Sequence, residues 1–178
     1  MRLKLTILSL NQKAVKGNQI MDKSYAEIVI EKKVITKMKP KEKIINDIQK
    51  YGWHVVHILD DDRGEKYSYT IGLTDSFKHP EIAISGLKPD ICSLIFEGIV
   101  ETIKDGFEYK VNKEYDDILE GYNCIFRQIS DNKYDNLFGK ATEYYKEKAF
   151  NVYQLFYPDN ENNFPWDNEY SLTIQELL

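Results

Sequence analysis

The sequence predicts an α+β fold, with a mainly antiparallel β-sheet that includes a β-hairpin and packs against two to three α-helices. Three observations predict it. Runs rich in β-branched and aromatic residues alternate with amphipathic segments, two such runs flank a polar turn at Gly64, and no regular βαβ repeat appears. The 178 residues, 42% hydrophobic and 13% aromatic, suffice for one folded domain with a short extension.

The first fifty residues are predicted to form two strands and a helix. Apolar residues recur with a strand-like period over 2–10 and again over 25–38. Pro40 then begins a short amphipathic segment, and Gly52 is placed to end it. The predicted order is therefore strand, strand and helix.

Met21 lies just before the second of these strands and marks a candidate boundary. We interpret residues 1–20 as a basic N-terminal extension or an extra strand. Residues 21–178 are interpreted as a single α+β domain.

The predicted hairpin pairs residues 53–59 with residues 66–73 across the turn DDDRGE. Successive side chains of a strand point to opposite faces, so His54 and His57 are expected on opposite sides of the hairpin. This geometry argues against a joint metal site. The aspartates of the turn lack the spacing of a calcium loop, and we interpret them as solvated. No metal is predicted.

The rest of the chain is predicted to mix strands and helices. A strand at 80–87 leads to a longer helix that begins at Pro89 and ends at Gly106. The later elements are expected in the order strand 122–130, helix 132–149, strand 150–158 and a loop before the C-terminal tail.

The charge is distributed unevenly along the chain. Residues 1–50 hold 12 Lys and Arg against 5 Asp and Glu, a net charge of +7, whereas residues 51–178 hold 12 against 24, a net charge of -12. An acidic body repels nucleic acid, which is therefore not expected as a partner. No apolar run has the length of a membrane span. Cys92 and Cys124 are expected to be buried free thiols, as in a cytoplasmic protein.

Four motifs in order carry a resemblance to a known family. They are GWHVV at 52–56, YTIGLTDSFKHPEIAISGL at 69–87, DGFEY at 105–109 and QLFYPDNENNFPWD at 154–167. This pattern resembles the bacterial domain-of-unknown-function family number 4262. In that family a glycine often precedes the aromatic residue of the last motif, where this chain has asparagines. A weaker likeness, at the level of the fold, is to the suppressor-of-fused type of α+β domain, which binds protein partners.

The best polar candidates for a ligand site follow the second strand of the hairpin. Tyr69 and Thr70 supply hydroxyl groups, and His79 and Glu81 of the HPE motif supply a titratable pair. The structural interpretation is a strand-connecting loop locked by a histidine–carboxylate pair, with the Glu81 carboxylate accepting backbone amides. The functional interpretation is the polar wall of a pocket. In that pocket His79 beside Glu81 would favour its charged form, so anion binding would strengthen at lower pH.

Aromatic residues of the late FPW motif are the second group of candidates. Phe164 and Trp166 either plug the core or form a stacking wall for a planar ligand or partner. Arg127 shares a strand face with Ile125 and Ile129, and it either forms an ion pair within the domain or offers its guanidinium to a carboxylate or phosphate. The ligand site is expected to join these residues to the hairpin group.

No catalytic motif is present, and neither catalytic residues nor cofactors are predicted. The sequence therefore favours a non-catalytic bacterial or phage binding domain. Its expected partner is a protein or a small anionic, nucleotide-like molecule. The expected setting is toxin immunity or phage–host conflict, and the chain could form a homo-oligomer. The alternative is a small hydrolase or transferase that uses His79 with Glu81.

Overall fold

The computed structural model of the protein describes residues 39–59, 66–172 and 174–178. The chain divides into two compact units, residues 1–46 and 47–178, with the division inside the first described helix. The predicted boundary at residue 20 and both predicted N-terminal strands lie outside the described residues.

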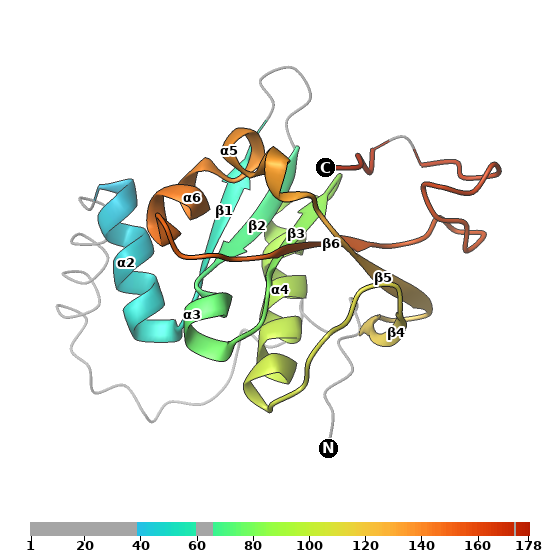
Figure 1. The fold of residues 1–178 in the computed structure, drawn as a ribbon. Coiled ribbons are helices and arrows are strands. Elements are labelled where there is room, and N and C mark those ends of the chain that lie inside the picture. Colours follow the sequence, from blue (N-terminus) through green and yellow to red (C-terminus); the bar gives the residue numbers. More distant parts are fainter. Residues whose placement is uncertain (1–38, 60–65, 173) are drawn as a thin grey trace, which may run out of the picture. The chain divides into compact units, whose positions relative to one another are not determined.

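Six strands of the described part form one sheet in the order β1-β2-β3-β6-β5-β4 (Figure 1). Among them, β3 and β6 pair in parallel and the other neighbours are antiparallel. The predicted α+β class with a mainly antiparallel sheet is therefore confirmed. The bounds are β1 His54–Ile58, β2 Tyr67–Ile71, β3 Glu81–Ser85, β4 Glu114–Leu119, β5 Tyr122–Gln128 and β6 Val152–Phe156.

The described residues contain more helices than the two to three predicted, because several are very short. Helix α4 agrees with the prediction, and α2 begins at the predicted proline. The bounds are α2 Pro40–Tyr51, α3 Leu73–Phe77, α4 Pro89–Lys104, the 3₁₀ turn η1 Asp131–Lys133, α5 Tyr134–Leu137 and α6 Gly139–Tyr145.

The hairpin of β1 and β2 is present as predicted, and its turn at 60–65 lies outside the described residues. The two histidines of β1 point to opposite sides of it. The ring of His54 meets the carboxylate of Asp47, and the ring of His57 meets the hydroxyl of Ser68, each at 2.7 Å. Each histidine therefore contacts a different partner.

The prediction of one helix over 132–149 was wrong. The segment forms η1, α5 and α6, and the break falls at Phe138, whose φ of -120° and ψ of 36° are not helical. The Phe138 side chain is fully buried, with its ring edge against Tyr69 at a centroid distance of 5.1 Å. The break in the helix coincides with this contact of Phe138 with the sheet. The helical period of the sequence does not reveal the break.

Two elements were not predicted. Strand β4 reads EYDDIL, and its charges hide the alternation of apolar and polar residues that identifies a strand. Helix α3 has five residues, too few for a helical period to appear, and it lies where a loop was expected.

One face of the sheet, here called the α4 face, carries the main hydrophobic core. It is defined by Ile82, Ile84, Phe126 and Leu155, which belong to one cluster with the buried side of α4. That side consists of Cys92, Ile95, Phe96, Ile99, Val100 and Ile103.

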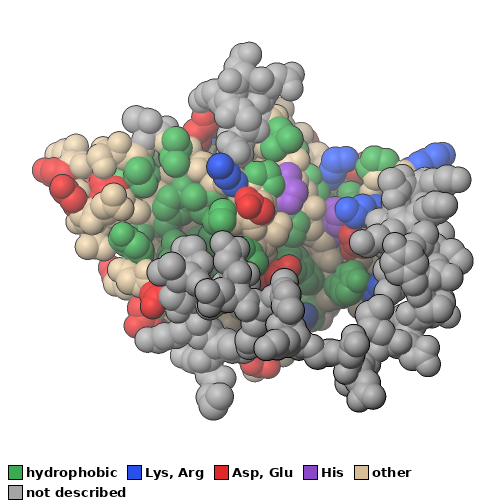
Figure 2. All heavy atoms as spheres, turned by 180° about the vertical axis from the view of Figure 1, so that it is seen from behind, with side chains coloured by type: hydrophobic (Ala, Val, Ile, Leu, Met, Phe, Trp, Pro, Cys, Tyr) green, Lys and Arg blue, Asp and Glu red, His purple; other side chains and the backbone are tan. Residues whose placement is uncertain are grey.

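Some hydrophobic side chains also reach the surface of the molecule. They gather in the middle of the view from behind, with charged side chains around them (Figure 2). Ile91 and Leu94 of α4 belong to the exposed hydrophobic residues.

Both cysteines lie in the core of the α4 face. Cys92 and Cys124 are fully buried free thiols, as predicted. Burial raises the pKa of the Cys92 thiol and raises that of Cys124 to about 12.

The opposite face, here called the polar face, carries a different set of side chains. Because side chains alternate along a strand, it holds Tyr67 and Tyr69 of β2, Ser85 of β3, Gln154 of β6 and Arg127 of β5. Ser85 and Gln154 are buried in spite of their polar groups.

Three separate segments of the described residues cover the polar face. The pair α5–α6 places Phe138 on β2. Residues 174–178, here called the tail, lie over β3 and β6. Residues 159–171, here called the late loop, place Trp166 against Phe156 of β6, with ring centroids 5.3 Å apart.

Candidate functional site

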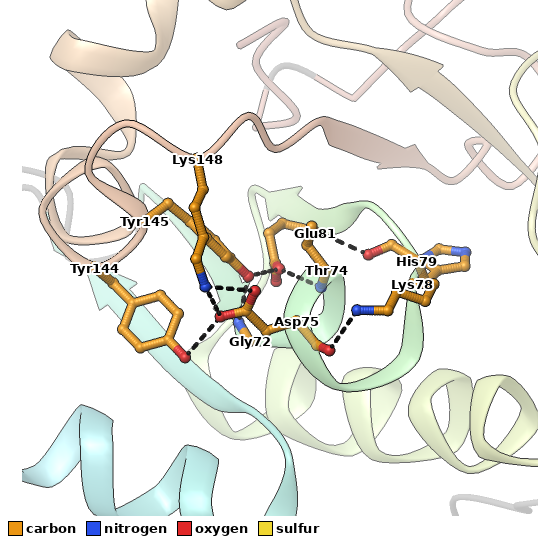
Figure 3. A network of polar contacts seen from close by, with 9 residues as sticks. All are labelled: Gly72, Thr74, Asp75, Lys78, His79, Glu81, Tyr144, Tyr145 and Lys148. Carbon is orange, nitrogen blue, oxygen red and sulfur yellow. Dashed lines mark hydrogen bonds and ion pairs between the residues drawn. The ribbon is translucent and has the colours of Figure 1, made fainter.

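Glu81 is the centre of a buried polar cluster at the start of β3 (Figure 3). One carboxylate oxygen accepts hydrogen bonds from the Tyr145 hydroxyl at 2.5 Å and from the Thr74 backbone amide at 2.9 Å. The other accepts a hydrogen bond from the Thr70 hydroxyl at 2.7 Å. One side chain therefore ties β2, α3 and α6 to β3.

Gly72 gives the backbone its shape at this cluster. Its φ of 111° lies in the left-handed region, and a Cβ there would stand 2.8 Å from the carbonyl oxygen of Gly52. Its amide donates a hydrogen bond of 3.0 Å to the Tyr145 hydroxyl, which in turn donates to Glu81. A glycine is required here because both the conformation and the space exclude a side chain.

The electrostatics of the cluster follow from its burial. Burial raises the pKa of Glu81, and the hydrogen bonds, first that from Tyr145, act against this rise. Burial also raises the pKa of Tyr145, as does the nearby Glu81 charge. Since the carboxylate is buried and receives three donors, the cluster fits an internal anchor better than a group that meets a substrate.

A second, more exposed layer of polar groups surrounds this anchor (Figure 3). Asp75 accepts a hydrogen bond from the Tyr144 hydroxyl at 3.2 Å and forms an ion pair with Lys148 at 3.3 Å. Residues 145–148 line an open depression of about 510 Å³ next to it. None of the predicted site residues lines that depression.

The expected pairing of His79 with Glu81 was wrong. His79 is buried, its Nδ1 lies 2.7 Å from the carbonyl oxygen of Pro80, and its Nε2 accepts the amide of Tyr109 at 3.3 Å. A neutral ring protonated at Nδ1 satisfies both contacts. Glu81 has other partners, so no histidine–carboxylate pair forms, although the Glu81 carboxylate accepts a loop amide as expected.

The predicted effect of pH on His79 is corrected for the same reason. Burial lowers the pKa of His79, against the opposing effect of its hydrogen bond to Pro80. The neutral form is favoured instead of the charged form. An anion would gain little from this residue as the pH falls.

Tyr69 lies apart from the Glu81 cluster. Its ring packs on Tyr67 and Phe138, and burial raises the pKa of its hydroxyl. That hydroxyl is buried without a hydrogen-bond partner among the described residues. Of the four polar candidates Tyr69, Thr70, His79 and Glu81, the structure joins Thr70 and Glu81 alone by a hydrogen bond.

Arg127, Trp166 and Phe164 form a stack on the polar face. The Arg127 guanidinium carbon lies 3.3 Å from the centroid of the Trp166 ring. The rings of Trp166 and Phe164 are parallel within 2° at a centroid distance of 4.9 Å. All three side chains are partly exposed. The strand face predicted for Arg127 and its neighbouring isoleucines is confirmed by the pairing of β5 with β6.

Asp159 holds the late loop that carries the stack. One carboxylate oxygen accepts the amides of Glu161 and Asn163, and the other accepts the amide and hydroxyl of Ser171. Burial acts to raise the pKa of Asp159, and these hydrogen bonds outweigh it and lower the pKa to about 2. Asn162 has a φ of 65°, so it adopts the left-handed conformation that a glycine would supply.

The structure separates the predicted site into two groups. Thr70 and Glu81 belong to the buried anchor, whereas Arg127, Phe164 and Trp166 form the stack. No hydrogen bond or ring contact among the described residues joins the two groups. The described residues also contain no group of three or more side chains that could hold a metal ion.

Several important residues were missed by sequence reasoning. Tyr145 lies 64 residues from Glu81, and nothing in its neighbourhood marks it. Asp159 carried a signal, since an Asp followed by Asn residues is typical of a turn in which the side chain accepts backbone amides. Ser85 and Gln154 look like ordinary strand residues.

One comparison with known proteins agrees with the family that the sequence resembles. Among the described residues, every helix is too short or too polar to span a lipid bilayer. No curated protein and no solved structure matches the chain. The likeness to suppressor-of-fused domains therefore stays a prediction. A family model described as "Domain of unknown function (DUF4262)" matches residues 47–171. The chain therefore belongs to the DUF4262 family.

Proposed function

We propose that the protein is a non-catalytic binding domain that recognises a protein partner through the stack of Arg127, Trp166 and Phe164. The observation that carries the proposal is the state of Arg127. Its guanidinium is held against Trp166, and it forms no hydrogen bond or ion pair with any described residue. A guanidinium fixed in this way keeps its N–H donors for a carboxylate.

The composition of the stack also supports a protein interface. Arg and Trp are enriched among the residues that dominate binding energies, because they combine a large apolar surface with hydrogen-bond donors. Asp159 fixes the late loop through four hydrogen bonds. A fixed loop loses little conformational entropy on binding.

The charge of the domain suggests the chemistry of the partner. Residues 51–178 carry a net charge of -12, which attracts a basic protein surface. Arg127 is then a cation in a region of the sequence with net negative charge, and it would select a partner that offers a carboxylate in a basic surrounding. We propose a basic toxin neutralised in the cytoplasm, or a basic protein of phage–host conflict, as a partner of this kind.

The alternative of a hydrolase or transferase loses its geometric support. It requires His79 and Glu81 to act together on a substrate, but both are buried and have separate partners. A small anionic ligand would meet the same donors of Arg127 as a protein carboxylate, and the experiment below separates the two.

The test is capture of partners from a lysate of the source cells by the full chain. The immobilised chain is compared with Arg127→Ala, Trp166→Ala and the control Lys110→Ala, which removes an exposed cation elsewhere. A protein held by the parent and the control but lost with both stack variants supports the proposal. If the stack variants hold the same proteins as the parent, or lose only a small molecule in native mass spectrometry, the protein-partner proposal is wrong.

A further inference from the structure

The tail is bound to the polar face mainly through its backbone. The Glu176 carbonyl oxygen accepts the Ser85 hydroxyl at 2.7 Å and the Gln154 side-chain amide at 2.6 Å. The Leu178 amide donates to the side-chain oxygen of Gln154 at 2.9 Å, and Lys133 reaches the Leu178 carbonyl oxygen at 3.0 Å. These four contacts are the kind that recognise an extended peptide regardless of most of its side chains.

Two side chains of the tail add specificity. The amide of Gln175 pairs with the backbone of Tyr157, accepting from its N–H at 3.1 Å and donating to its C=O at 2.8 Å. Leu178 is 9% exposed, whereas Ile174 and Leu177 are 55% and 61% exposed. The recognised pattern is therefore Gln-x-x-Leu.

The polar groups under the tail belong to the family domain, whereas the tail does not. The family match ends at residue 171. Ser85 and Gln154 are buried within the sheet, and burying such groups costs free energy unless they are hydrogen-bonded. Gln154 uses both its donor and its acceptor, and the tail supplies a partner to each. The matched residues thus carry a row of side chains complementary to a segment that follows the family match.

We propose that Ser85, Gln154, Tyr157 and Lys133 form a binding strip for an extended peptide with the pattern Gln-x-x-Leu, presented by a partner protein. The tail of this chain occupies the strip and competes with that peptide. The proposal does not depend on the Arg127 stack, because none of the four strip residues belongs to it.

The strength of the competition between the tail and the peptide follows from the covalent link of the tail to its site. A segment tethered next to its own site acts at an effective concentration in the millimolar range, so a micromolar peptide cannot displace it without a weakened tail. A chain whose own tail binds poorly should therefore accept the peptide. The unaltered chain should resist it.

The experiment uses the full chain with Gln175→Ala and Leu178→Ala, which removes both specific tail contacts. The probe is a fluorescein-labelled peptide with the sequence of residues 171–178, titrated by fluorescence anisotropy. We expect it to bind this double variant at least about tenfold more tightly than the parent. A peptide that carries the same two substitutions should bind neither protein.

Two glycines offer a matched control for the position of the peptide. A Cβ on Gly86 would stand 2.4 Å from the Ile174 carbonyl oxygen, whereas a Cβ on Gly121 meets nothing, and both have positive φ angles of 78° and 84°. Adding Gly86→Ala to the double variant should abolish peptide binding. Adding Gly121→Ala should leave it, and so should Arg127→Ala.

Equal and weak binding to the parent and to the folded double variant would overturn the proposal. If the double variant does not fold, hydrogen exchange on the parent decides. A Leu178 amide that exchanges by a local opening far more often than the core amides supports a displaceable tail. A Leu178 amide that exchanges only with global unfolding shows that the tail is an integral part of the fold, and it overturns the proposal.

Discussion

The two faces of the sheet are built in different ways. In the described part of the chain, the α4 face packs against α4 and holds one continuous apolar cluster. The polar face is covered by α5–α6, the tail and the late loop, and its buried groups include the hydroxyl of Ser85 and the amide of Gln154. Apolar contact is not directional, whereas these polar groups need partners at defined positions.

This difference separates stability from recognition. A continuous apolar core supplies most of the free energy of folding, and a substitution within it affects the whole domain. The tail and the late loop are short segments held largely by hydrogen bonds, and such segments contribute less each and can open one at a time. We therefore expect substitutions on the α4 face to unfold the chain, and those in the tail or the late loop to alter individual segments.

The largest effect is expected on the α4 face. Phe96 is fully buried, so Phe96→Ala should lower the free energy of unfolding by about 3–5 kcal/mol. On the polar face, Phe164→Ala should cost about 0.5–1.5 kcal/mol for the lost ring pair. Urea denaturation of both variants measures this. Equal costs would show that the two faces do not differ in this way.

Glu81→Gln should rank next, because its amide nitrogen carries two N–H donors where a protonated carboxyl has one, at a position lined by groups that are themselves donors. We expect a loss of about 1–3 kcal/mol, measured by urea denaturation, with the exposed Glu97→Gln as control. A variant as stable as the control would show that the carboxylate is not an anchor.

The same residue gives a defined dependence on pH. Burial raises the pKa of Glu81, so the folded chain keeps a proton that the unfolded chain loses near its ordinary pKa of about 4.3. The stability that this proton contributes is complete below that pH and is lost as the pH rises through the folded-state pKa. Glu81→Gln should lack this decline, so its deficit should shrink with rising pH. A constant deficit would contradict the raised pKa.

A smaller effect with the opposite sign is expected at Asp159. Its pKa is lowered to about 2, so its contribution is present at neutral pH and is lost as the pH falls from the ordinary value of about 3.9 through the folded-state value. Asp159→Asn should have a lower Tm at pH 6, and the difference should narrow towards pH 2. Thermal unfolding followed by circular dichroism measures it, and the exposed Asp116→Asn should show no such convergence.

The smallest effect is expected at Arg127. A cation over an aromatic ring at a partly exposed site contributes about 0.5–1 kcal/mol, and Arg127→Ala should lower the free energy of unfolding by that amount. Urea denaturation measures this, with Arg127→Lys as the variant that keeps the charge. A loss as large as that of Phe96→Ala would place Arg127 in the folding core.

The two faces also differ in how far the sequence predicts them. The helical period of α4 and the alternation along β3 and β5 indicate the α4 face, because apolar side chains leave a periodic signal. The anchor of Glu81 depends on Tyr145, and the strip of Ser85 and Gln154 depends on the tail. Such pairs form only in the folded chain, since hydrogen bonds between distant residues leave no period.

The site predictions follow the same division. Glu81 accepting a loop amide could be predicted because donor and acceptor lie a few residues apart. Two alternatives stood open for Arg127, an ion pair within the domain or a guanidinium offered to a carboxylate or phosphate. Its stack on Trp166 was not predicted, because it depends on the packing of the late loop. The pairing of His79 with Glu81 was wrong because closeness in sequence does not set the direction of a side chain.

The two buried thiols allow thiol labelling to measure unfolding of the domain. Cys92 and Cys124 both lie in the core of the α4 face, where burial raises their pKa and keeps them protonated. A thiol reagent reacts with the thiolate and needs access, so it should modify them only when the α4 face separates. Departure of the tail or the late loop should leave both sulfurs unlabelled. The labelling rate therefore measures unfolding of the whole domain. It does not respond to local opening of segments on the polar face.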